Sequence, residues 1–543
     1  MIRIDQIKIK PSKDDRLLAG AVAGKLGIKT EDILDLGIIR KSLDARKKPD
    51  LYSVYSVWVR TSKDEKLLKR FRKDDKVSVF EPVKYRLPEP GTEILNNRPV
   101  IVGMGPAGLF CAYELAISGY RPVVLERGRA VEKRKEDVKR FWETGILDTV
   151  SNVQFGEGGA GTFSDGKLAT SVKDKEGRIH EVLRIFTDNG APYDILYDQM
   201  PHLGTDILPV IVKSMREKII SCGGEILFET KLSAVSVKEN CITSVTAECE
   251  DGSIKEIPCD VLMLATGHSA RDTYKMLYES GLKMEQKPFA AGFRVQHPQK
   301  MIDIDRYGSY DAAELLGASP YKLTSNFEGR GVFSFCMCPG GYVVNASSEE
   351  GETCVNGMSY SGRNSVSANS AIVVSIPVSE YGSDHPLAGI DFQRKLERKA
   401  YEAGGGRIPA ERYGDFKKSV SGEAGGDHAS KIFEDFEPQF KGEYAWCDLS
   451  GIFDEGINEL FVKGMTSFGH IIKDFDASEV IMAGVESRTS SPVRIPRNDD
   501  MESSVKGIYP LGEGAGYAGG ITSAAADGLR GAEAIISKYS AFQ

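Results

Sequence analysis

Hydrophobic and polar residues alternate through the first eighty residues in a way that predicts four strands and two helices. Residues 2–9, 33–43 and 51–60 are strand-like, and 14–27 have the apolar spacing of a helix ending on Gly27. A charged helix over 63–71 and a strand over 76–80 complete a βαββαβ order. That order predicts a small N-terminal ferredoxin-like α/β domain over residues 1–80. The prolines of residues 81–98 indicate a linker.

The pattern then changes to a short buried strand over 99–103, which leads into closely spaced glycines. Gly103, Gly105 and Gly108 accompany a helix over 106–118, and a second strand over 121–126 ends in Glu126. The first glycine permits a tight turn, the second lets the backbone approach a pyrophosphate, and the third lets helix and strand pack closely. The helix N-terminus offers free N–H groups to phosphate, and an acid after the second strand accepts from ribose hydroxyls. We therefore predict a Rossmann-type dinucleotide site.

Three later segments extend this prediction. Residues 152–167 contain five glycines, which indicate either a bare backbone lying against a flat ring system or a mobile loop. A buried strand ends in Ala265-Thr266-Gly267, a motif that commonly closes the adenine side of such sites. A strand over 507–511 then meets Gly512-Glu513-Gly514, Gly519-Gly520 and a helix over 521–537, whose positive end is expected to face a flavin. Together the pieces predict non-covalent FAD.

The fold class that follows is α/β, with a Rossmann-type FAD-binding domain split along the chain. Residues 99–285 form its first part and 496–543 its second, while 286–495 are a mixed α+β substrate or cap domain inserted between them. The residues predicted to bind FAD are Gly103, Gly105, Pro106, Ala107, Gly108, Glu126, Arg127, Gly159, Ala160, Gly161, Thr162, Thr266, Gly267, Pro339, Gly340, Gly512, Glu513, Gly519, Gly520 and Ile521.

Charge and composition narrow the class of protein. The chain has 543 residues and a net charge of −8. Residues 1–95 hold 22 Lys/Arg and 15 Asp/Glu, a net of +7, so the remainder carries −15. No apolar run predicts a signal peptide or a membrane span, and the nine scattered cysteines include no CxxC pair. We predict a cytoplasmic protein without a metal site, and the absence of hydrolase or kinase motifs disfavours those classes.

At this point the motifs resemble a family of uncharacterised bacterial FAD-dependent dehydrogenases, the NAD(P)/FAD-dependent oxidoreductases distantly similar to BaiN-like flavoproteins. The matching stretches include VIVGMGPAGLF, NVQFGEGGAGTFSDGKL, ATGHSARDTY, FSFCMCPGGYVVNASSE and YPLGEGAGYAGGITSAAADG, and they span residues 99–530. The resemblance implies the same fold and the same cofactor. It implies no particular substrate.

Three residues are candidates for catalysis. Cys338 precedes Pro339-Gly340-Gly341, and this segment either lies against the flavin, buries a structural thiol, or pairs Cys338 with Cys336 in a disulfide. The disulfide is disfavoured because residues i and i+2 of a strand point in parallel about 6.6 Å apart. His297 can donate a proton near neutral pH or serve as a structural hydrogen bonder. Arg488 can bind an anionic substrate or form a salt bridge.

The leading functional hypothesis is an FAD-dependent oxidoreductase that moves hydride between a small organic substrate and flavin N5. No second GxGxxG motif is present, so NAD(P)H would bind as a transient donor without its own Rossmann domain, or a protein would supply electrons. One alternative is an RNA-associated flavoprotein that docks through its basic N-terminal domain, for which residues 40–50 are the best support. RNA-binding motifs are absent, however, and nucleic acid is not the expected partner. Another is a non-catalytic flavin-bound interaction protein.

Overall fold

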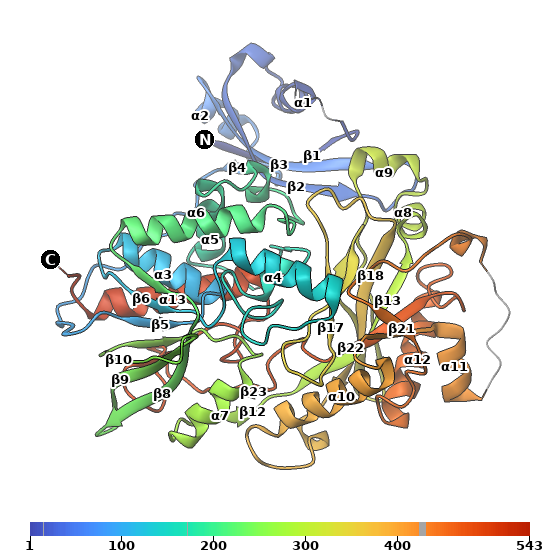
Figure 1. The fold of residues 1–543 in the computed structure, drawn as a ribbon. Helices are drawn as coiled ribbons and strands as arrows, with labels where there is room; N and C mark the ends of the chain where they lie inside the picture. Colours follow the sequence, from blue (N-terminus) through green and yellow to red (C-terminus); the bar gives the residue numbers. More distant parts are fainter. Residues whose placement is uncertain (13, 15, 171, 423–429, 543) are drawn as a thin grey trace.

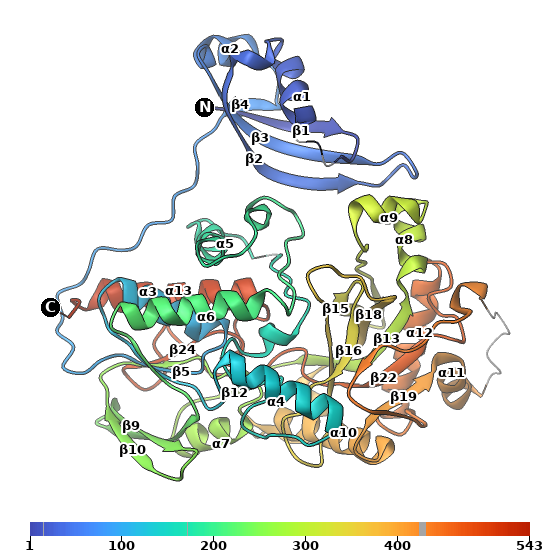
Figure 2. The ribbon, with the colours of Figure 1, turned by 45° about the horizontal axis from the view of Figure 1, so that its top comes forward.

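The structure is a computed structural model that describes residues 1–12, 14, 16–170, 172–422 and 430–542. An N-terminal unit stands on a larger body made of two parts, one built on a parallel sheet and the other on a mostly antiparallel one (Figure 1, Figure 2). The predicted α/β class with a parallel sheet is thereby confirmed. Among the described residues, no helix is both long and apolar enough to cross a bilayer.

The N-terminal unit is a four-stranded antiparallel sheet of order β2-β3-β1-β4 with two helices against one face (Figure 2). Its elements are β1 (Ile2–Ile9), α1 (Arg16–Leu26), β2 (Ile33–Asp44), β3 (Tyr52–Thr61), α2 (Asp64–Arg70) and β4 (Val77–Val79). The inward residues of the alternating strands, among them Ile4 and Val57, pack on Leu18 and Val22 of α1. Each element lies within two residues of its predicted range, except that Asp15 of the predicted first helix lies outside the described residues.

The parallel part of the body brings distant segments of the chain into one five-stranded sheet of order β24-β11-β5-β6-β7. These strands are β5 (Val100–Val102), β6 (Val123–Leu125), β7 (Glu225–Leu227), β11 (Leu262–Leu264) and β24 (Ile508–Pro510). One face packs on α3 (Pro106–Ile117), α6 (Leu208–Ser221) and α13 (Ile521–Lys538), and α5 (Arg178–Asp188) packs on the outer side of these helices (Figure 2). The other packs on β8 (Thr230–Lys238), β9 (Cys241–Cys249), β10 (Ile254–Pro258) and α7 (Arg271–Glu279).

The second part is a seven-stranded sheet of order β14-β15-β18-β13-β22-β19-β21. Its strands are β13 (Phe289–Pro298), β14 (Thr324–Phe327), β15 (Arg330–Cys338), β18 (Ser367–Ile376), β19 (Ile408–Arg412), β21 (Tyr444–Trp446) and β22 (Ile481–Glu486). A smaller sheet joins β16 (Tyr342–Asn345), β17 (Val355–Met358) and β20 (Phe440–Lys441), and β12 (Glu285–Gln286) pairs with β23 (Val493–Arg494). The helices are α8 (Gln299–Tyr307), α9 (Asp311–Leu316), α10 (Ala388–Gly404), α11 (Tyr413–Ser421) and α12 (Glu455–Gly469). Between the two parts lies α4 (Val131–Thr144) (Figure 1).

The proline-containing segment after the N-terminal unit is not a free tether along its whole length. From Tyr85 onward it packs along α13: the Tyr85 hydroxyl donates to Glu533 at 3.0 Å, and the Gly91 N–H donates to the Ile536 carbonyl at 2.8 Å. A Cβ at Gly91 would meet the Lys538 backbone at 2.2 Å, so only glycine permits this approach. The segment after Lys84 therefore belongs structurally to the body.

We expect a chain that starts at Lys84 to keep its FAD, because the cofactor site described below uses no residue of the N-terminal unit. A chain that starts at Asn96 should melt at a lower temperature, since it loses the contacts with α13. Flavin absorbance per chain and thermal denaturation measure both. Loss of flavin from the chain starting at Lys84 would contradict the prediction.

Candidate functional site

A cavity of about 360 Å³ opens at the carboxyl ends of β5, β6 and β11, where the two parts of the body meet. In parallel sheets this edge is the usual place for ligands. Its walls come from the glycine turn after β5, the glycine-rich segment 154–169, the start of α13 and three strands of the second part. The residues that line it include fifteen of those predicted to bind FAD: Gly103, Gly105, Pro106, Ala107, Glu126, Arg127, Gly159, Ala160, Gly161, Thr266, Gly267, Glu513, Gly519, Gly520 and Ile521.

The glycines after β5 differ in what each one does. Gly103 has a φ of +95°, and a Cβ there would lie 2.4 Å from the Ala265 carbonyl oxygen. At Gly108 a Cβ would lie 1.9 Å from the Gly103 carbonyl oxygen, so this glycine allows α3 to pack on the turn and does not line the cavity. Gly105 is open, since the nearest atom to an added Cβ is the Gly159 Cα at 3.8 Å. The space at Gly105 is thus left for a ligand.

Glu126 at the end of β6 is fixed by backbone donors. Its Oε2 accepts from the Met104 N–H at 2.7 Å, and its Oε1 accepts from Gly128 at 2.9 Å and Gly156 at 3.0 Å. The carboxylate is 5 % exposed and lines the cavity. It therefore joins the turn after β5 to the glycine-rich segment while keeping acceptor capacity for a ribose hydroxyl.

Arg134 of α4 organises the glycine-rich segment, and sequence reasoning missed it. Its guanidinium is fully buried and donates to five carbonyl oxygens at 2.7–3.2 Å: those of Asn152, Val153, Gly156, Glu157 and Gly159. Burial lowers the pKa of Arg134 to about 10, which still leaves it charged at neutral pH. A single cation therefore holds the segment in place.

His268 faces the cavity next to Glu513. It is 8 % exposed, and within the described part of the chain neither ring nitrogen has a hydrogen-bond partner. Its Nδ1 lies 3.4 Å from Glu513 Oε1. Buried polar atoms without partners are rare in native proteins, so these nitrogens are consistent with a ligand at this position.

Five predicted cofactor residues lie outside the cavity. Gly108 and Gly512 serve packing, because a Cβ at Gly512 would meet the Ala107 Cβ at 2.7 Å. Thr162 is part of the glycine-rich segment, but its side chain is 1 % exposed and lies next to Gly158 instead of lining the cavity. The backbone of Pro339 and Gly340 is held elsewhere by side chains: the Pro339 carbonyl accepts from the Ser359 hydroxyl, and the Gly340 N–H donates to the Gln299 side-chain oxygen.

A bulge in β15 explains why Cys336, and not Cys338, faces the cavity. The pairing of β15 with β18 shifts register between Phe335 and Cys338, and Cys336 takes a φ of +45°. Phe335 and Cys336 line the cavity, while the Cys338 thiol is fully buried 3.8 Å from the Arg294 guanidinium. This placement argues against the predicted catalytic role of Cys338 and the predicted contact of residues 338–341 with the flavin.

His297 does not line the cavity either. Its side chain is fully buried, its Nε2–H donates to the Phe475 carbonyl at 2.9 Å, and its ring stacks on Phe475 with centroids 4.2 Å apart. Burial lowers the pKa of His297 to about 4, so the ring is neutral. These contacts fit the structural alternative for this histidine and argue against catalysis.

Arg488 lines the cavity, but its guanidinium group forms an ion pair with Glu397. Its Nε and Nη2 donate to the two Glu397 oxygens at 2.9 and 2.7 Å, and Glu397 also accepts from Arg271 at 2.7 Å. Ion pairing holds the pKa of Arg488 above its ordinary value despite burial. These contacts fit the alternative in which Arg488 forms a salt bridge, and they connect the segment after β22 with α10 and α7.

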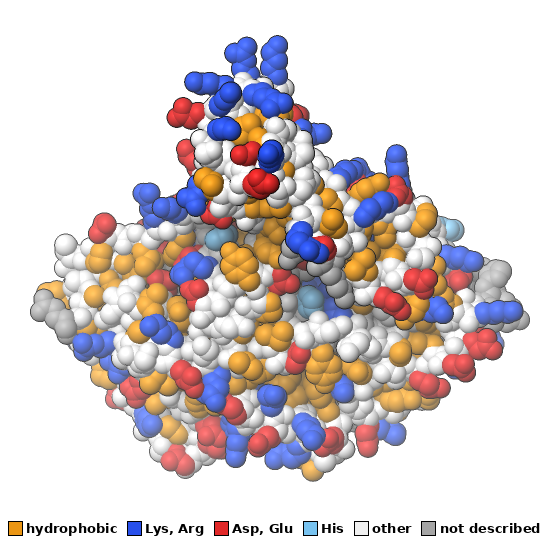
Figure 3. All heavy atoms as spheres, turned by 90° about the horizontal axis from the view of Figure 1, so that it is seen from above, with side chains coloured by type: hydrophobic (Ala, Val, Ile, Leu, Met, Phe, Trp, Pro, Cys, Tyr) orange, Lys and Arg blue, Asp and Glu red, His pale blue; other side chains and the backbone are white. Residues whose placement is uncertain are grey.

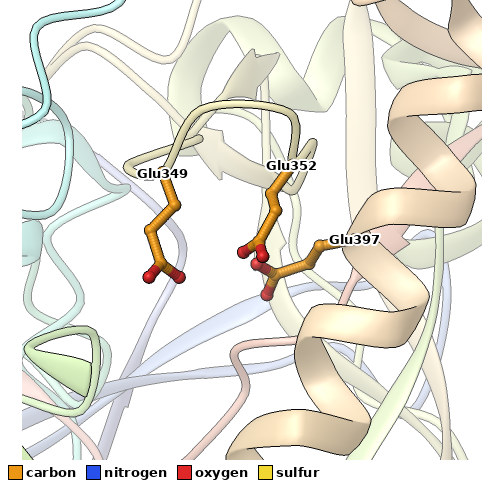
Figure 4. A group of neighbouring side chains, drawn as sticks. All are labelled: Glu349, Glu352 and Glu397. Carbon is orange, nitrogen blue, oxygen red and sulfur yellow. The ribbon is translucent and has the colours of Figure 1, made fainter. Parts of the chain in front are cut away.

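Glu349, Glu352 and Glu397 form an acidic cluster around these arginines, with carboxylate oxygens within 4.8 Å of one another (Figure 4). Arg271 pairs with all three, and Arg394, Arg398 and Arg488 pair with one or two each. The positive charge that balances these carboxylates within the described residues therefore comes from arginine side chains.

Glu352 makes the stability of this cluster depend on pH. Burial, with Glu397 and Glu349 close by, raises its pKa above the ordinary glutamate value of 4.5. The folded state therefore holds a proton that the unfolded state releases, and stability falls as pH rises from 4.5 through the raised value. Glu352→Gln should reduce that fall, matching the wild type near pH 5 and exceeding it near pH 8. Urea denaturation at both pH values measures this, with exposed Glu402→Gln as control; parallel pH curves for Glu352→Gln and wild type would contradict it.

The fold and cavity define a flavoprotein that binds FAD. The open space at Gly105, the glycine-lined wall and the His268 nitrogens, which make no hydrogen bond within the described residues, all fit that cofactor. A family model described as "FAD-dependent protein, C-terminal domain-like" matches residues 288–489, and one described as "Domain of unknown function (DUF8436)" matches residues 1–60. The predicted cofactor FAD is confirmed, and the protein is an FAD-dependent enzyme.

The chain belongs to the same family as an uncharacterized protein of Clostridium beijerinckii, with 43% identity over 543 residues and 99% of each chain covered. It is also 26% identical over 235 residues to a flavin-dependent monooxygenase from an unknown prokaryotic organism, across 42% of this chain and 52% of that one.

Among solved structures, it is similar to a triple mutant of the flavin-dependent brominase Bmp2, with 13% identity, 81% and 80% of the two chains covered and a TM-score of 0.37. A flavoprotein/dehydrogenase from Cytophaga hutchinsonii has 12% identity, 81% and 78% coverage and a TM-score of 0.34. These two structural similarities are too weak to indicate a reaction.

Proposed function

We propose that the protein is an FAD-dependent oxidoreductase of small organic substrates, in which the bound cofactor exchanges hydride with the substrate at flavin N5. The observation that carries this proposal is that the cavity has two unlike walls. One is glycine backbone, with the predicted cofactor residues. The other, here called the polar end, consists of Asp165, Lys167, Cys336, Asn356 and Glu486.

The polar end supports an anionic or carbonyl-bearing substrate. Lys167 Nζ lies 3.8 Å from Asp165 Oδ2, but Arg363 already binds that carboxylate through two hydrogen bonds of 2.5 and 3.1 Å. Because Arg363 neutralises Asp165, Lys167 retains a net positive charge toward the cavity. A substrate carboxylate or carbonyl oxygen is the natural partner of such a cation.

Arg294 gives the polar end its shape. It is fully buried and pairs with Glu486 at 3.0 Å, and it donates to the Cys336 carbonyl at 3.2 Å and to Asn356 at 3.4 Å. The bulge that presents Cys336 and the side chain of Asn356 are therefore held by one cation. A fixed polar end favours orientation of a substrate over mere enclosure of the cofactor.

The test is to mix the purified protein, without oxygen, with each of a panel of possible hydride donors. The panel holds small carboxylates, alcohols whose oxidation gives a carbonyl compound, NADH and NADPH. Loss of flavin absorbance reports reduction of the flavin. We expect at least one small anion to bleach the flavin, and Lys167→Met to raise the concentration required. Lys173→Met is the matched control, since Lys173 is exposed and does not line the cavity. A flavin that no donor of the panel reduces would favour the non-catalytic flavoprotein and reject the proposal.

The RNA-associated alternative gains little from the N-terminal unit. Lys and Arg side chains gather at its protruding end (Figure 3), but many basic residues of the unit pair with its own carboxylates, as in Lys8–Asp44 and Lys25–Asp74. Strand β2 is also in contact with the body, since the Lys41 N–H donates to the Tyr197 carbonyl at 2.8 Å. The ion pairs within the unit and the contact of β2 with the body leave fewer of its basic side chains free to bind a polyanion.

A further inference from the structure

A second cavity, of about 780 Å³, lies between α4 and the small sheet β17-β16-β20. We call it the α4 groove, and its cationic and aromatic lining is Lys135, Lys139, Trp142, Phe163, Tyr360, Arg407, Phe440, Lys441 and Tyr444. It is separate from the FAD cavity but shares walls with it: Gly161 and Phe163 of one turn face the two cavities, as do Asn356 and Met358 of β17. Neither the cofactor site nor the polar end uses it.

The groove carries positive charge that the protein does not neutralise. Among the described residues, Lys135, Arg407 and Lys441 have no carboxylate within ion-pair distance; Lys135 and Arg407 are exposed, and Lys441 is half-buried. The groove's acids are Glu143 and Glu443, and Glu143 is 3.7 Å from Lys139. Lys441 Nζ instead lies over the Tyr342 ring, 4.4 Å from its centroid. Three cations are therefore available to an anion.

The aromatic side chains of the groove are held in place and partly exposed. The Trp142 indole N–H donates to the Asn345 carbonyl at 3.0 Å, which fixes the ring and leaves its hydrogen bonding satisfied. Lys135, Lys139 and Trp142 follow at i, i+4 and i+7, so they share one face of α4. Tyr360 is 38 % exposed on the opposite wall. Rings of this kind stack on planar ligands, and stacking on a base is sequence-tolerant and favourable.

We infer that the α4 groove binds a nucleoside phosphate, with the base against the aromatic side chains and the phosphate at Lys135, Arg407 and Lys441. A ligand with both a planar ring and a multiply charged anion satisfies both features of the lining, whereas a simple anion uses only the cations. The groove is within the volume range of small-molecule sites. The inference does not depend on the reaction proposed above, because it concerns binding alone.

The test is calorimetric titration of FAD-saturated protein, in which the FAD cavity is already filled, with ADP, NADH and NADPH, and with inorganic phosphate and benzoate as partial ligands. We expect at least one nucleotide to bind more tightly than phosphate or benzoate, with affinity that decreases as salt increases. Lys441→Glu and Lys135→Glu should each weaken it at least tenfold, and Tyr360→Ala should weaken it without changing its salt dependence.

Lys255→Glu is the control for charge reversal, since Lys255 lies exposed on β10. Flavin content and melting temperature verify that each variant is folded. Phosphate binding as tight as that of any nucleotide would show a simple anion site and overturn the inference. Nucleotide binding unaffected by Lys441→Glu and Lys135→Glu would place the nucleotide elsewhere and overturn it too, as would the absence of nucleotide binding.

Discussion

Gly105→Val is expected to abolish FAD binding while leaving the protein folded. Gly105 has φ −72° and ψ −177°, an extended conformation open to any residue and favourable before Pro106. A valine there meets no backbone strain, and the nearest protein atom to its Cβ lies 3.8 Å away. The rest of the side chain must then occupy the cavity where the phosphates of FAD are expected. We expect at least ~100-fold weaker binding, equivalent to ~2.7 kcal/mol.

Flavin absorbance after gel filtration and titration of the apoprotein with FAD measure this loss, and circular dichroism reports the fold. Gly451→Val is the matched control, because a Cβ at Gly451 meets no atom within 4 Å and that residue does not line the cavity. Gly105→Ala should fall between the two. Full flavin content in Gly105→Val would reject the assignment of this turn to the pyrophosphate.

The parallel sheet and most of the cofactor wall were predictable because local rules determine them. The glycines after β5, the acid after β6 and the glycines before α13 are spaced as a dinucleotide requires, and hydrophobic runs mark the strands between them. The tight turn was expected at the first glycine, and the left-handed conformation lies there, at Gly103. The close contact of Gly103 with the Ala265 backbone was not predictable, because it joins residues distant in sequence.

The polar end was poorly predicted because irregular backbone creates it. Regular alternation along β15 places Cys336 and Cys338 on the same side, and the prediction chose Cys338 for its neighbouring glycines. The bulge turns Cys336 toward the cavity and Cys338 toward Arg294. Bulges of this kind often redirect a side chain near a functional site, and their position follows from the partner strand. Neither Asn356 nor Glu486 carries a local motif, and the tertiary fold alone brings them to the cavity.

Arg134 shows a signal that was present but overlooked. The buried stripe of α4 runs Val131, Arg134, Val138 and Phe141, so an arginine occupies a position where helical spacing calls for an apolar residue. A charged residue on a buried stripe is rarely tolerated without several hydrogen bonds. The glycine-rich segment supplies those acceptors, because its closely spaced carbonyls have no sheet or helix to bind them.

Arg134→Met is therefore expected to lose FAD and to lower the free energy of unfolding. Methionine replaces the stem of the arginine but none of its donors, so five carbonyl oxygens lose a buried hydrogen bond. Two of them, those of Gly156 and Gly159, keep a backbone N–H donor, and three are left without the donor they had. Each buried carbonyl left unpaired costs about 1–3 kcal/mol, but the segment can relax toward solvent, so we expect a net loss of about 3 kcal/mol or more. FAD affinity should fall with it, since Gly159 and Gly161 of this segment line the cavity. Urea denaturation of the apoprotein and FAD titration measure the two effects separately.

Arg140→Met on the same helix is the matched control, because the Arg140 side chain is 52% exposed and its nearest carboxylate oxygen lies 3.5 Å away. It should change neither stability nor FAD affinity appreciably, since exposed ion pairs contribute little. Arg134→Lys should recover part of the stability. The lysine ammonium group has three N–H donors at a single nitrogen, so it can bond some, but not all, of the carbonyl oxygens that the guanidinium reaches from its three nitrogens. If Arg134→Met keeps wild-type FAD affinity although its stability falls, the segment does not need this arginine to hold its cofactor-binding conformation, and the cation is only part of the core. If both stay unchanged, the five hydrogen bonds contribute nothing net to folding.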